Sequence, residues 1–290
     1  METASGGAGD LQLQIECCAI CNAACVFCPY PTMERQRGTM SMDLFRKIID
    51  DACTITRFSD VTLTGLGEPL LDKHLIERVK YIRTKFQPNV TITVYTNGTY
   101  LTEAKAQELC DAGVSILYVS INSFDHRRRK AIMGLDDYEV VEKQTRRAIE
   151  IFAKAAKEKG TAQRCVVKAV VSKDLFEPGE PEQFLDKWGG EWNKGGSAFI
   201  HMEGNWAGLM YPVRVQPENC CHRAIGEIMV LWDGRVSICC FDGEGKYILG
   251  DLNTQTIREM YNSKTAWDFR NAHASGGRKD LPLCSTCTAI

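Results

Sequence analysis

The stretch Cys21-Asn-Ala-Ala-Cys25-Val-Phe-Cys28 groups three cysteines directly after a short apolar run. Three thiolates at this spacing can bind one [4Fe–4S] cluster and leave its fourth iron without a protein ligand. An iron with an open position can bind a small molecule, by the same logic that separates catalytic from structural zinc sites. Zinc itself would need a fourth ligand close by, and the next histidine, His74, is far away in the sequence. The motif therefore indicates a reactive iron–sulfur site.

The chain has 290 residues and 14 cysteines in an otherwise ordinary globular composition, with 25% charged and 44% hydrophobic residues. Its first ten residues lack the basic and apolar segments of a signal peptide. We therefore expect a reducing, cytoplasmic compartment, where grouped cysteines bind metals or act as catalytic thiols. The formal net charge of -2 disfavours a protein that coats nucleic acid, and no apolar run is long enough for a transmembrane helix. We expect neither a nucleic acid nor a membrane as a partner.

Short β-branched runs alternate with amphipathic stretches along the first two thirds of the chain. The runs predict strands over 11–18, 58–64, 90–96, 116–121, 165–172 and 198–201. Apolar residues at helical spacing predict helices over 42–53, 73–86, 103–112, 138–159 and 181–188. Six such repeats predict an α/β fold, a partial (β/α)6 TIM barrel, with its reactive residues at the carboxyl ends of the strands. We expect a flexible N-terminus over 1–10, this barrel over 11–208 and a small module over 209–290.

Three further motifs lie where expected strands end: Gly65-Leu66-Gly67-Glu68-Pro69, Tyr95-Thr96-Asn97-Gly98 and Val119-Ser120-Ile121-Asn122. Together with the cysteine triplet they resemble the radical S-adenosylmethionine (SAM) enzymes, whose signature is C-x3-C-x-aromatic-C, followed by G-G-E-P and T-N-G motifs. The resemblance implies that Cys21, Cys25 and Cys28 bind a [4Fe–4S] cluster whose open iron binds SAM. One-electron reduction of SAM then yields a 5′-deoxyadenosyl radical, which abstracts a hydrogen atom from the substrate.

The same resemblance assigns residues to SAM itself. It places an aromatic residue beside the adenine and polar strand-end residues near the methionine, ribose and carboxylate groups. The chain departs from the family pattern at Leu66, which separates the two glycines and makes the first glycine a weaker match than the second. The implied SAM-binding residues are Phe27, Gly65, Gly67, Glu68, Thr96, Asn97 and Ser120.

A second set of cysteines follows near the C-terminus: Cys220, Cys221, Cys239, Cys240, Cys284 and Cys287. Apolar runs over 228–232 and 236–240, around Asp233-Gly234, predict a β-hairpin with a type I′ turn, and helices follow over 257–262 and 266–273. The spacing permits a structural zinc site with four cysteine ligands. It also resembles the twitch domain, the short form of the SPASM domain. That resemblance implies an auxiliary [4Fe–4S] cluster bound by Cys221, Cys239, Cys284 and Cys287, with Cys220 as the alternative to Cys221.

Cys240 follows directly on one of these expected ligands, and neighbouring residues on a strand point to opposite faces. It is either a buried inert thiol, the usual state of a free cysteine, or a catalytic residue that donates a hydrogen atom to a substrate radical. The second interpretation makes the protein an epimerase. The other cysteines fall within expected strands and helices, where we expect core packing: Cys17, Cys18, Cys53, Cys110 and Cys165.

Several polar residues near the expected strand ends are further candidates. Lys168 lies within an apolar strand and can point into the barrel. Residues after the sixth strand are candidates for the substrate entrance, because substrates bind at this end of such barrels: His201, Glu203, Asn205 and Trp206. Asp242 is a candidate contact to the substrate or the cluster. The basic run over 126–130 is expected to be a solvated helix start.

The length and architecture resemble those radical SAM enzymes with a twitch domain that tailor aminoglycoside antibiotics. The resemblance implies a small sugar-type substrate in antibiotic biosynthesis, and the cysteine pair favours its epimerisation through Cys240. Dehydrogenation of a secondary alcohol, with the auxiliary cluster as electron acceptor, is the main alternative. Peptide modification is disfavoured, because the residues before the first strand are too few for a peptide-binding winged helix. A non-catalytic iron–sulfur electron carrier is the alternative outside enzymes. An enzyme of this kind needs a reducing partner such as flavodoxin or ferredoxin.

Overall fold

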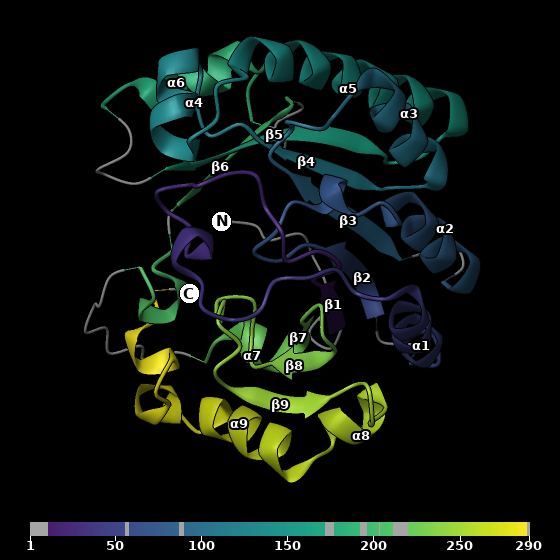
Figure 1. Ribbon diagram of the computed structural model, residues 1–290, viewed down its shortest axis with the longest axis vertical. Coiled ribbons are helices and arrows are strands. Elements are labelled where there is room, and N and C mark those ends of the chain that lie inside the picture. The colour runs from purple at the N-terminus through teal and green to yellow at the C-terminus, as the bar shows by residue number, and fades with distance from the viewer. Residues whose placement is uncertain are drawn as a thin grey trace.

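One sheet of nine strands organises the molecule, in the order β6-β5-β4-β3-β2-β1-β7-β8-β9 (Figure 1). The computed structural model describes residues 11–55, 58–86, 90–171, 177–191, 196–202, 204–210 and 220–288. Six consecutive parallel strands form the partial (β/α)6 barrel that the sequence predicts. They are β1 (Leu11–Ile15), β2 (Phe58–Leu63), β3 (Thr91–Thr96), β4 (Ile116–Ser120), β5 (Arg164–Val171) and β6 (Ala198–Met202).

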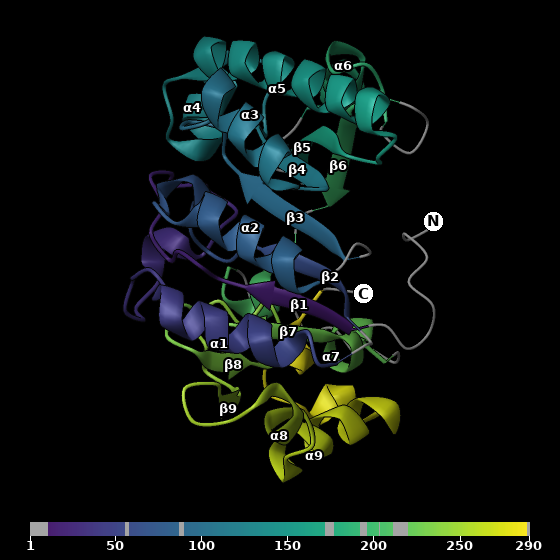
Figure 2. The same cartoon turned by 90° about the vertical axis from the view of Figure 1, so that its right-hand side faces the viewer.

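Helices cover the outer face of the barrel strands, as Figures 1 and 2 show. Side-chain caps begin three of them: Ser41 accepts a hydrogen bond from the Leu44 N–H, Thr102 accepts one from the Lys105 N–H, and Asp125 accepts one from the Arg128 N–H. Gly113 ends the helix that Thr102 begins, with a left-handed φ of 99°. The barrel helices are α1 (Met42–Ala52), α2 (Leu75–Lys85), α3 (Glu103–Ala112), α4 (His126–Met133), α5 (Tyr138–Lys159) and α6 (Glu180–Lys187).

The two faces of the barrel strands differ in polarity. Residues such as Leu13, Val61 and Val94 are fully buried in the hydrophobic core, which also contains the apolar faces of the helices. Because successive strand residues point to opposite faces, their neighbours face the barrel interior, and many of these are polar: Gln14, Asp60, Thr62, Thr93, Tyr95, Tyr118 and Lys168. The barrel therefore offers a polar inner surface to a bound molecule.

The C-terminal module continues this sheet. Its first strand, β7 (Glu227–Val230), pairs parallel with β1, whereas β8 (Arg235–Ser237) and β9 (Ile248–Asp251) pair antiparallel. The predicted type I′ turn is wrong, because it requires positive φ at both central residues and only Gly234, at +94°, has one. Strand β9 was not predicted. The module's helices are α7 (His222–Gly226), α8 (Ile257–Tyr261) and α9 (Lys264–Ala274).

Two expectations lie outside the described residues: the flexible N-terminus over 1–10 and the candidate Glu203. The division of the chain between residues 208 and 209 stays a prediction. Among the described residues, no helix is both long and apolar enough to cross a membrane.

Candidate active site

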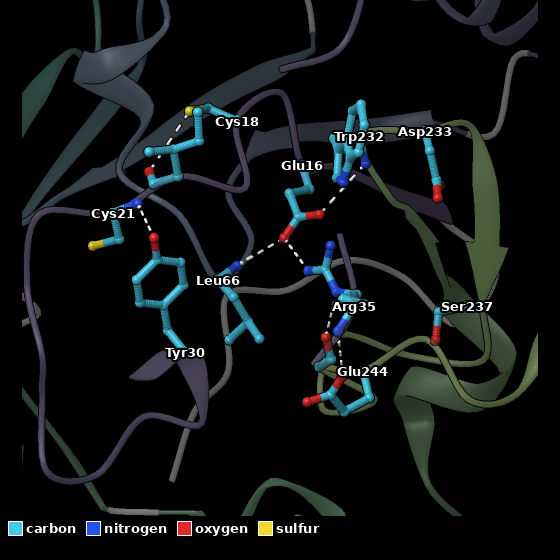
Figure 3. Close-up of polar contacts among 12 residues, drawn as sticks. Glu16, Cys18, Cys21, Tyr30, Arg35, Leu66, Trp232, Asp233, Ser237 and Glu244 are labelled. Atoms are coloured by element: carbon cyan, nitrogen blue, oxygen red, sulfur yellow. Dashed lines mark hydrogen bonds and ion pairs between the residues drawn. The ribbon is translucent and has the colours of Figure 1, made fainter. Parts of the chain in front are cut away.

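The first cysteine triplet lies in a loop between β1 and a short 3-10 helix (Tyr30–Thr32). The N–H groups of Ala24 and Val26 donate to carbonyls at the end of α4, at 3.0 and 2.9 Å. The Tyr30 hydroxyl accepts a hydrogen bond of 2.8 Å from the N–H of Cys21 (Figure 3). Neighbouring elements thus hold the loop, so its three thiols stay close to the strand ends.

These three thiols form a donor set that suits a cationic partner. Burial raises the pKa of all three cysteines, to about 12 for Cys28. The pKa of Cys25 is raised further by the charges of Cys28 and Cys21. A thiolate is the form of cysteine that binds metal. A bound cation is a large local charge that deprotonates a coordinating thiol, so iron bound here would offset the cost of ionising these three cysteines. The predicted ligands therefore fit a [4Fe–4S] cluster.

The glycines of the Gly65–Pro69 loop are required by close packing. A Cβ at Gly67 would lie 1.9 Å from the carbonyl oxygen of Cys18, and one at Gly65 would lie 2.4 Å from the Glu16 side chain. No real Cβ fits at these distances, so both positions need glycine. Packing therefore requires Gly65 in this chain, although Leu66 makes this glycine a weaker match to the family motif.

Replacing Gly67 with alanine should lower the rate of 5′-deoxyadenosine formation by about 100-fold, because a displacement of about 1 Å at a reactive site can cost that much. The added methyl group must push this loop away from the backbone of Cys18. Gly160→Ala is a control, since nothing lies within 4 Å of its Cβ position and it bears only the strain of a φ of +62°. Equal rates for the two variants would contradict this packing role.

Glu68 joins the predicted SAM-binding motifs at the ends of β2 and β3. It is only 1% exposed, and its carboxylate accepts hydrogen bonds from the Thr96 hydroxyl at 2.7 Å and the Asn97 N–H at 2.6 Å. Its own N–H donates to the carbonyl of Ile20, directly before the cluster loop. The Asn97 amide lies 3.9 Å from the sulfur of Cys21. The structure therefore brings these motifs and the cysteine loop to one place.

Arg129 supports the same strand ends from outside the motifs. It is fully buried, and its guanidinium donates to the carbonyls of Asn97 and Ile121, at 2.9 and 3.3 Å, and to Asp137 at 2.6 Å. Its place in the basic run over 126–130 predicts a solvated side chain, and this prediction is wrong for Arg129. No sequence pattern separates Arg129 from its neighbours, which are exposed or paired at the surface.

The two remaining SAM-binding predictions lie in the same region. Phe27 is 9% exposed and packs in the core with the cluster cysteines, and its carbonyl accepts a hydrogen bond of 2.9 Å from the Trp206 indole. Ser120 ends β4, is half-buried and pairs in register with Lys168 of β5. Trp206 therefore contacts the cluster loop through its indole N–H, a role that its position after β6 did not reveal.

A buried carboxylate, Glu16, lies where the barrel meets the C-terminal module (Figure 3). It accepts hydrogen bonds from the Leu66 N–H at 3.0 Å, from the Arg35 guanidinium at 2.6 Å and from the Trp232 N–H at 3.4 Å. The Glu16 and Arg35 side chains are 0% and 5% exposed. One carboxylate thus connects the glycine loop, the segment after the cluster loop and the β7–β8 turn.

Arg35 extends this connection toward Cys240. Its guanidinium donates to the Gly243 carbonyl at 2.6 Å, and its N–H donates to the Glu244 carboxylate at 3.1 Å (Figure 3). Both partners belong to the turn that follows Cys240. Glu16 and Arg35 could not be recognised from the sequence, because their partners are separated from them by up to about two hundred residues along the chain.

The C-terminal cysteines surround a cavity. Its wall includes four cysteines and otherwise mainly apolar side chains; the cysteines are Cys221, Cys239, Cys284 and Cys287. Cys220 is exposed and does not line it. Burial raises the pKa of Cys284 to about 12, and the charge of Cys287 adds to this shift. The four cysteines that line the cavity are those predicted to bind the auxiliary cluster, and four thiolates fit a [4Fe–4S] cluster. Among the described residues, no group of three or more His, Cys, Asp or Glu side chains is placed to hold a single metal ion.

Cys239 and Cys240 differ in their surroundings. Strand β8 ends at Ser237, so neither cysteine lies in a strand. The premise of alternating strand neighbours was therefore wrong, but the two side chains still have different neighbours. Cys239 lines the cavity, whereas the sulfur of Cys240 lies 3.7 Å from the Arg223 guanidinium, which is itself 3.4 Å from the Glu227 carboxylate. Burial and the charge of Glu227 raise the pKa of the Cys240 thiol.

Lys168 and a row of aromatic rings line the barrel near this thiol. The ammonium of Lys168 lies 5.0 Å from the centre of the Tyr95 ring, which stacks on Tyr118 at 4.7 Å. Burial and the charge of Arg223 together lower the pKa of Lys168 to about 8. Burial and the charge of Lys168 lower the pKa of His201 to about 4. The expectation that Lys168 points into the barrel is consistent with these contacts.

Two candidate substrate contacts are instead structural. Asn205 is fully buried, and its side chain bonds to Thr286 at 2.6 Å and Thr288 at 3.0 Å in the C-terminal tail. Asp242 is 2% exposed and accepts hydrogen bonds from the Ser237 hydroxyl and from two backbone N–H groups. These hydrogen bonds use the polar groups of both side chains within the fold, so they support neither Asn205 as a residue of the substrate entrance nor Asp242 as a contact to the substrate or the cluster.

Comparison with known proteins identifies the family. A model of the radical SAM superfamily matches residues 15–166. This chain belongs to the radical SAM superfamily. A second model, the SPASM iron–sulfur cluster-binding domain, matches residues 220–288. The cofactors of this radical SAM protein are therefore SAM and two [4Fe–4S] clusters. The assignment of individual ligands stays a prediction.

Two curated relatives differ in how much of each chain they match. The chain is 23% identical over 279 residues to the S-adenosyl-L-methionine-dependent 2-deoxy-scyllo-inosamine dehydrogenase of Niallia circulans, covering 96% of this chain and 92% of that protein. It is 27% identical over 165 residues to the tungsten-containing aldehyde ferredoxin oxidoreductase cofactor-modifying protein of Pyrococcus furiosus. That match covers 57% of this chain and 44% of the relative, so the chain spans less than half of that relative's length.

Solved structures share the fold across nearly the whole chain. BtrN in complex with AdoMet and 2-DOIA superposes with a TM-score of 0.67 at 18% identity, covering 97% of this chain and 94% of BtrN. Streptococcus suis SuiB bound to precursor peptide SuiA superposes with a TM-score of 0.69 at 13% identity, covering 96% and 70%. At these identities the likeness shows the fold alone.

Proposed function

We propose that this radical SAM enzyme abstracts a hydrogen atom from a carbon of a small sugar-type molecule, and that it epimerises this carbon with Cys240 as the hydrogen-atom donor. The observation that supports the proposal is the position of Cys240, outside the cysteine-lined cavity and beside Arg223. SAM and the cluster that binds it supply the 5′-deoxyadenosyl radical that takes the first hydrogen atom.

Inversion requires that the new C–H bond form on the face opposite to the broken one. The predicted ligands of the SAM-binding cluster lie in the loop after β1, whereas Cys240 belongs to the turn after β8. Transfer of the thiol hydrogen atom breaks the S–H bond and leaves a sulfur radical on Cys240. This radical regains one electron and one proton, with flavodoxin or ferredoxin as the expected source of the electron.

The barrel interior suits a small polar molecule. Lys168 and Arg223 supply positive charge, Glu227 supplies negative charge, and Tyr95 and Tyr118 supply aromatic surface. Charged and aromatic groups of this kind fix the orientation of a polar ligand. Similarity over nearly the full length to an inosamine dehydrogenase also supports an aminoglycoside-like substrate, and with it a role in antibiotic biosynthesis.

A labelling experiment in deuterated water tests the proposal. The reconstituted enzyme is incubated with SAM, a reductant and a panel of aminoglycosides and amino-cyclitols. We expect a product of unchanged formula that carries one solvent deuterium, because the thiol of Cys240 exchanges its hydrogen with water. Cys240→Ala should abolish this product while 5′-deoxyadenosine is still formed. Cys165→Ala, in the buried core, is the matched control. Normal epimer formation by Cys240→Ala would refute the assignment.

Dehydrogenation of a secondary alcohol is the second candidate, because a relative that matches nearly the full length of this chain is a dehydrogenase. In that reaction the substrate radical loses an electron to the auxiliary cluster and a proton to a base. The same incubation distinguishes the two reactions, since dehydrogenation lowers the product mass by two hydrogens and incorporates no deuterium at the attacked carbon. In either case we expect the enzyme to work in the cytoplasm, where thiols stay reduced.

A further inference from the structure

A buried histidine faces the cavity that the four C-terminal cysteines surround. His273 lies in the last turn of α9 and is 1% exposed. It lines the same cavity as Cys221, Cys239, Cys284 and Cys287. The ring of Phe269, one turn earlier on α9, meets its imidazole edge-on, with the ring centres 4.9 Å apart. The imidazole is therefore held between an aromatic ring and the cysteine-lined cavity.

Neither ring nitrogen of His273 has a hydrogen-bond partner within the described chain. Buried polar groups in native proteins are almost always hydrogen-bonded, because leaving one without a partner costs free energy. An imidazole carries at least one N–H donor in every protonation state found in proteins. A group held in the cavity would satisfy the imidazole N–H, provided that this group accepts a hydrogen bond.

An iron–sulfur cluster is such an acceptor. Its sulfurs carry negative charge, and hydrogen bonds to the sulfurs are among the features that determine its reduction potential. The rest of the cavity wall consists mostly of apolar side chains, which offer no hydrogen bond, and of Arg223 and Arg278, which carry only donors. The cluster that the cysteines would hold is therefore the acceptor that the geometry provides.

We propose that His273 donates a hydrogen bond from its imidazole N–H to a sulfur of the auxiliary cluster, and that this bond raises the cluster's reduction potential. The direction follows from charge. One-electron reduction adds negative charge to the cluster, so a donor directed at a sulfur stabilises the reduced form more than the oxidised form. His273 is thus a positioning and tuning residue, without contact to the substrate.

The test is a redox titration of the reconstituted full-length protein, followed by electron paramagnetic resonance. Addition of SAM identifies the signal of the SAM-binding cluster, and the remaining signal belongs to the auxiliary cluster. In His273→Phe we expect about eight irons per chain, as in the parent, because no ligand is lost. The midpoint potential of the auxiliary cluster should shift to a more negative value. His273→Gln, which keeps an N–H donor, should restore part of this shift.

Phe269→Leu is the matched control, because it loosens the packing of the same cavity wall without removing a donor. A shift in His273→Phe that Phe269→Leu does not reproduce supports the hydrogen bond. An unchanged potential in His273→Phe would overturn the proposal. Loss of iron in that variant would overturn it as well, because it would make His273 a ligand. The titration uses no substrate, so its result is independent of whether the enzyme epimerises or dehydrogenates.

Discussion

Replacement of Cys25 with alanine should reduce 5′-deoxyadenosine formation to the level of protein without iron. The iron content should fall from about eight to about four per chain, because only the auxiliary cluster remains. Cys25 shares its loop with Cys21 and Cys28, and the charges of both neighbours act on it. A cluster with two protein ligands in place of three loses the ligand set that leaves a single open iron for SAM. Iron analysis and chromatography of the SAM products measure both effects.

Cys110→Ala is the matched control for this variant. Cys110 lies on α3 in the hydrophobic core and is 1% exposed. Its removal should leave the iron content and the 5′-deoxyadenosine yield near those of the parent, at the cost of a small loss of packing. If Cys25→Ala keeps the full iron content and cleaves SAM at the parent rate, the assignment of the three ligands is wrong.

Arg35→Met should lower the free energy of unfolding by about 3–5 kcal/mol, the usual cost of breaking a buried ion pair by removing one partner. The substitution leaves the Glu16 carboxylate buried without its charged partner and frees the turn that contains Gly243. The corresponding fall in melting temperature is on the order of 10 °C. Anaerobic calorimetry of the reconstituted protein measures it. The double variant Glu16→Gln with Arg35→Met should recover part of the loss, because no charge is then left buried.

Arg46→Met is the control for the loss of stability expected in Arg35→Met. Arg46 pairs with Glu77 at 2.7 Å, but their side chains are 44% and 47% exposed. Exposed ion pairs contribute roughly 0–1 kcal/mol, so this variant should melt close to the parent temperature. A fall in Arg35→Met no larger than in Arg46→Met would show that the buried pair does not hold the two modules together.

Much of the fold and of the candidate site could be predicted because the decisive patterns are local. The cysteine triplet, the strand and helix periods and the caps at Ser41 and Thr102 each lie within a few consecutive residues. Parallel strands place their carboxyl ends at one edge, so motifs at successive strand ends were expected to meet. Glu68 and Asn97 confirm this, because they are hydrogen-bonded to each other.

The errors arose where a local pattern has more than one structural outcome. Asp233-Gly234 is compatible with several turns, and the chain adopts one with a single positive φ, at Gly234. Asn205 and Asp242 follow strands as substrate-binding residues do, yet their side chains are used in hydrogen bonds within the fold. A polar side chain in a sequence does not show whether its hydrogen bonds are already satisfied.

The sequence by itself determined the family, the barrel and the two groups of cysteines, because residue type and spacing are sufficient for each. Only the tertiary structure decided that β7 pairs with β1 and that Cys221, not Cys220, lines the cavity. It also decided that Cys240 contacts Arg223 without lining that cavity and that His273 lines it. These relations join segments far apart along the chain, and side-chain direction and burial depend on the complete packing. Local spacing carries no information on either.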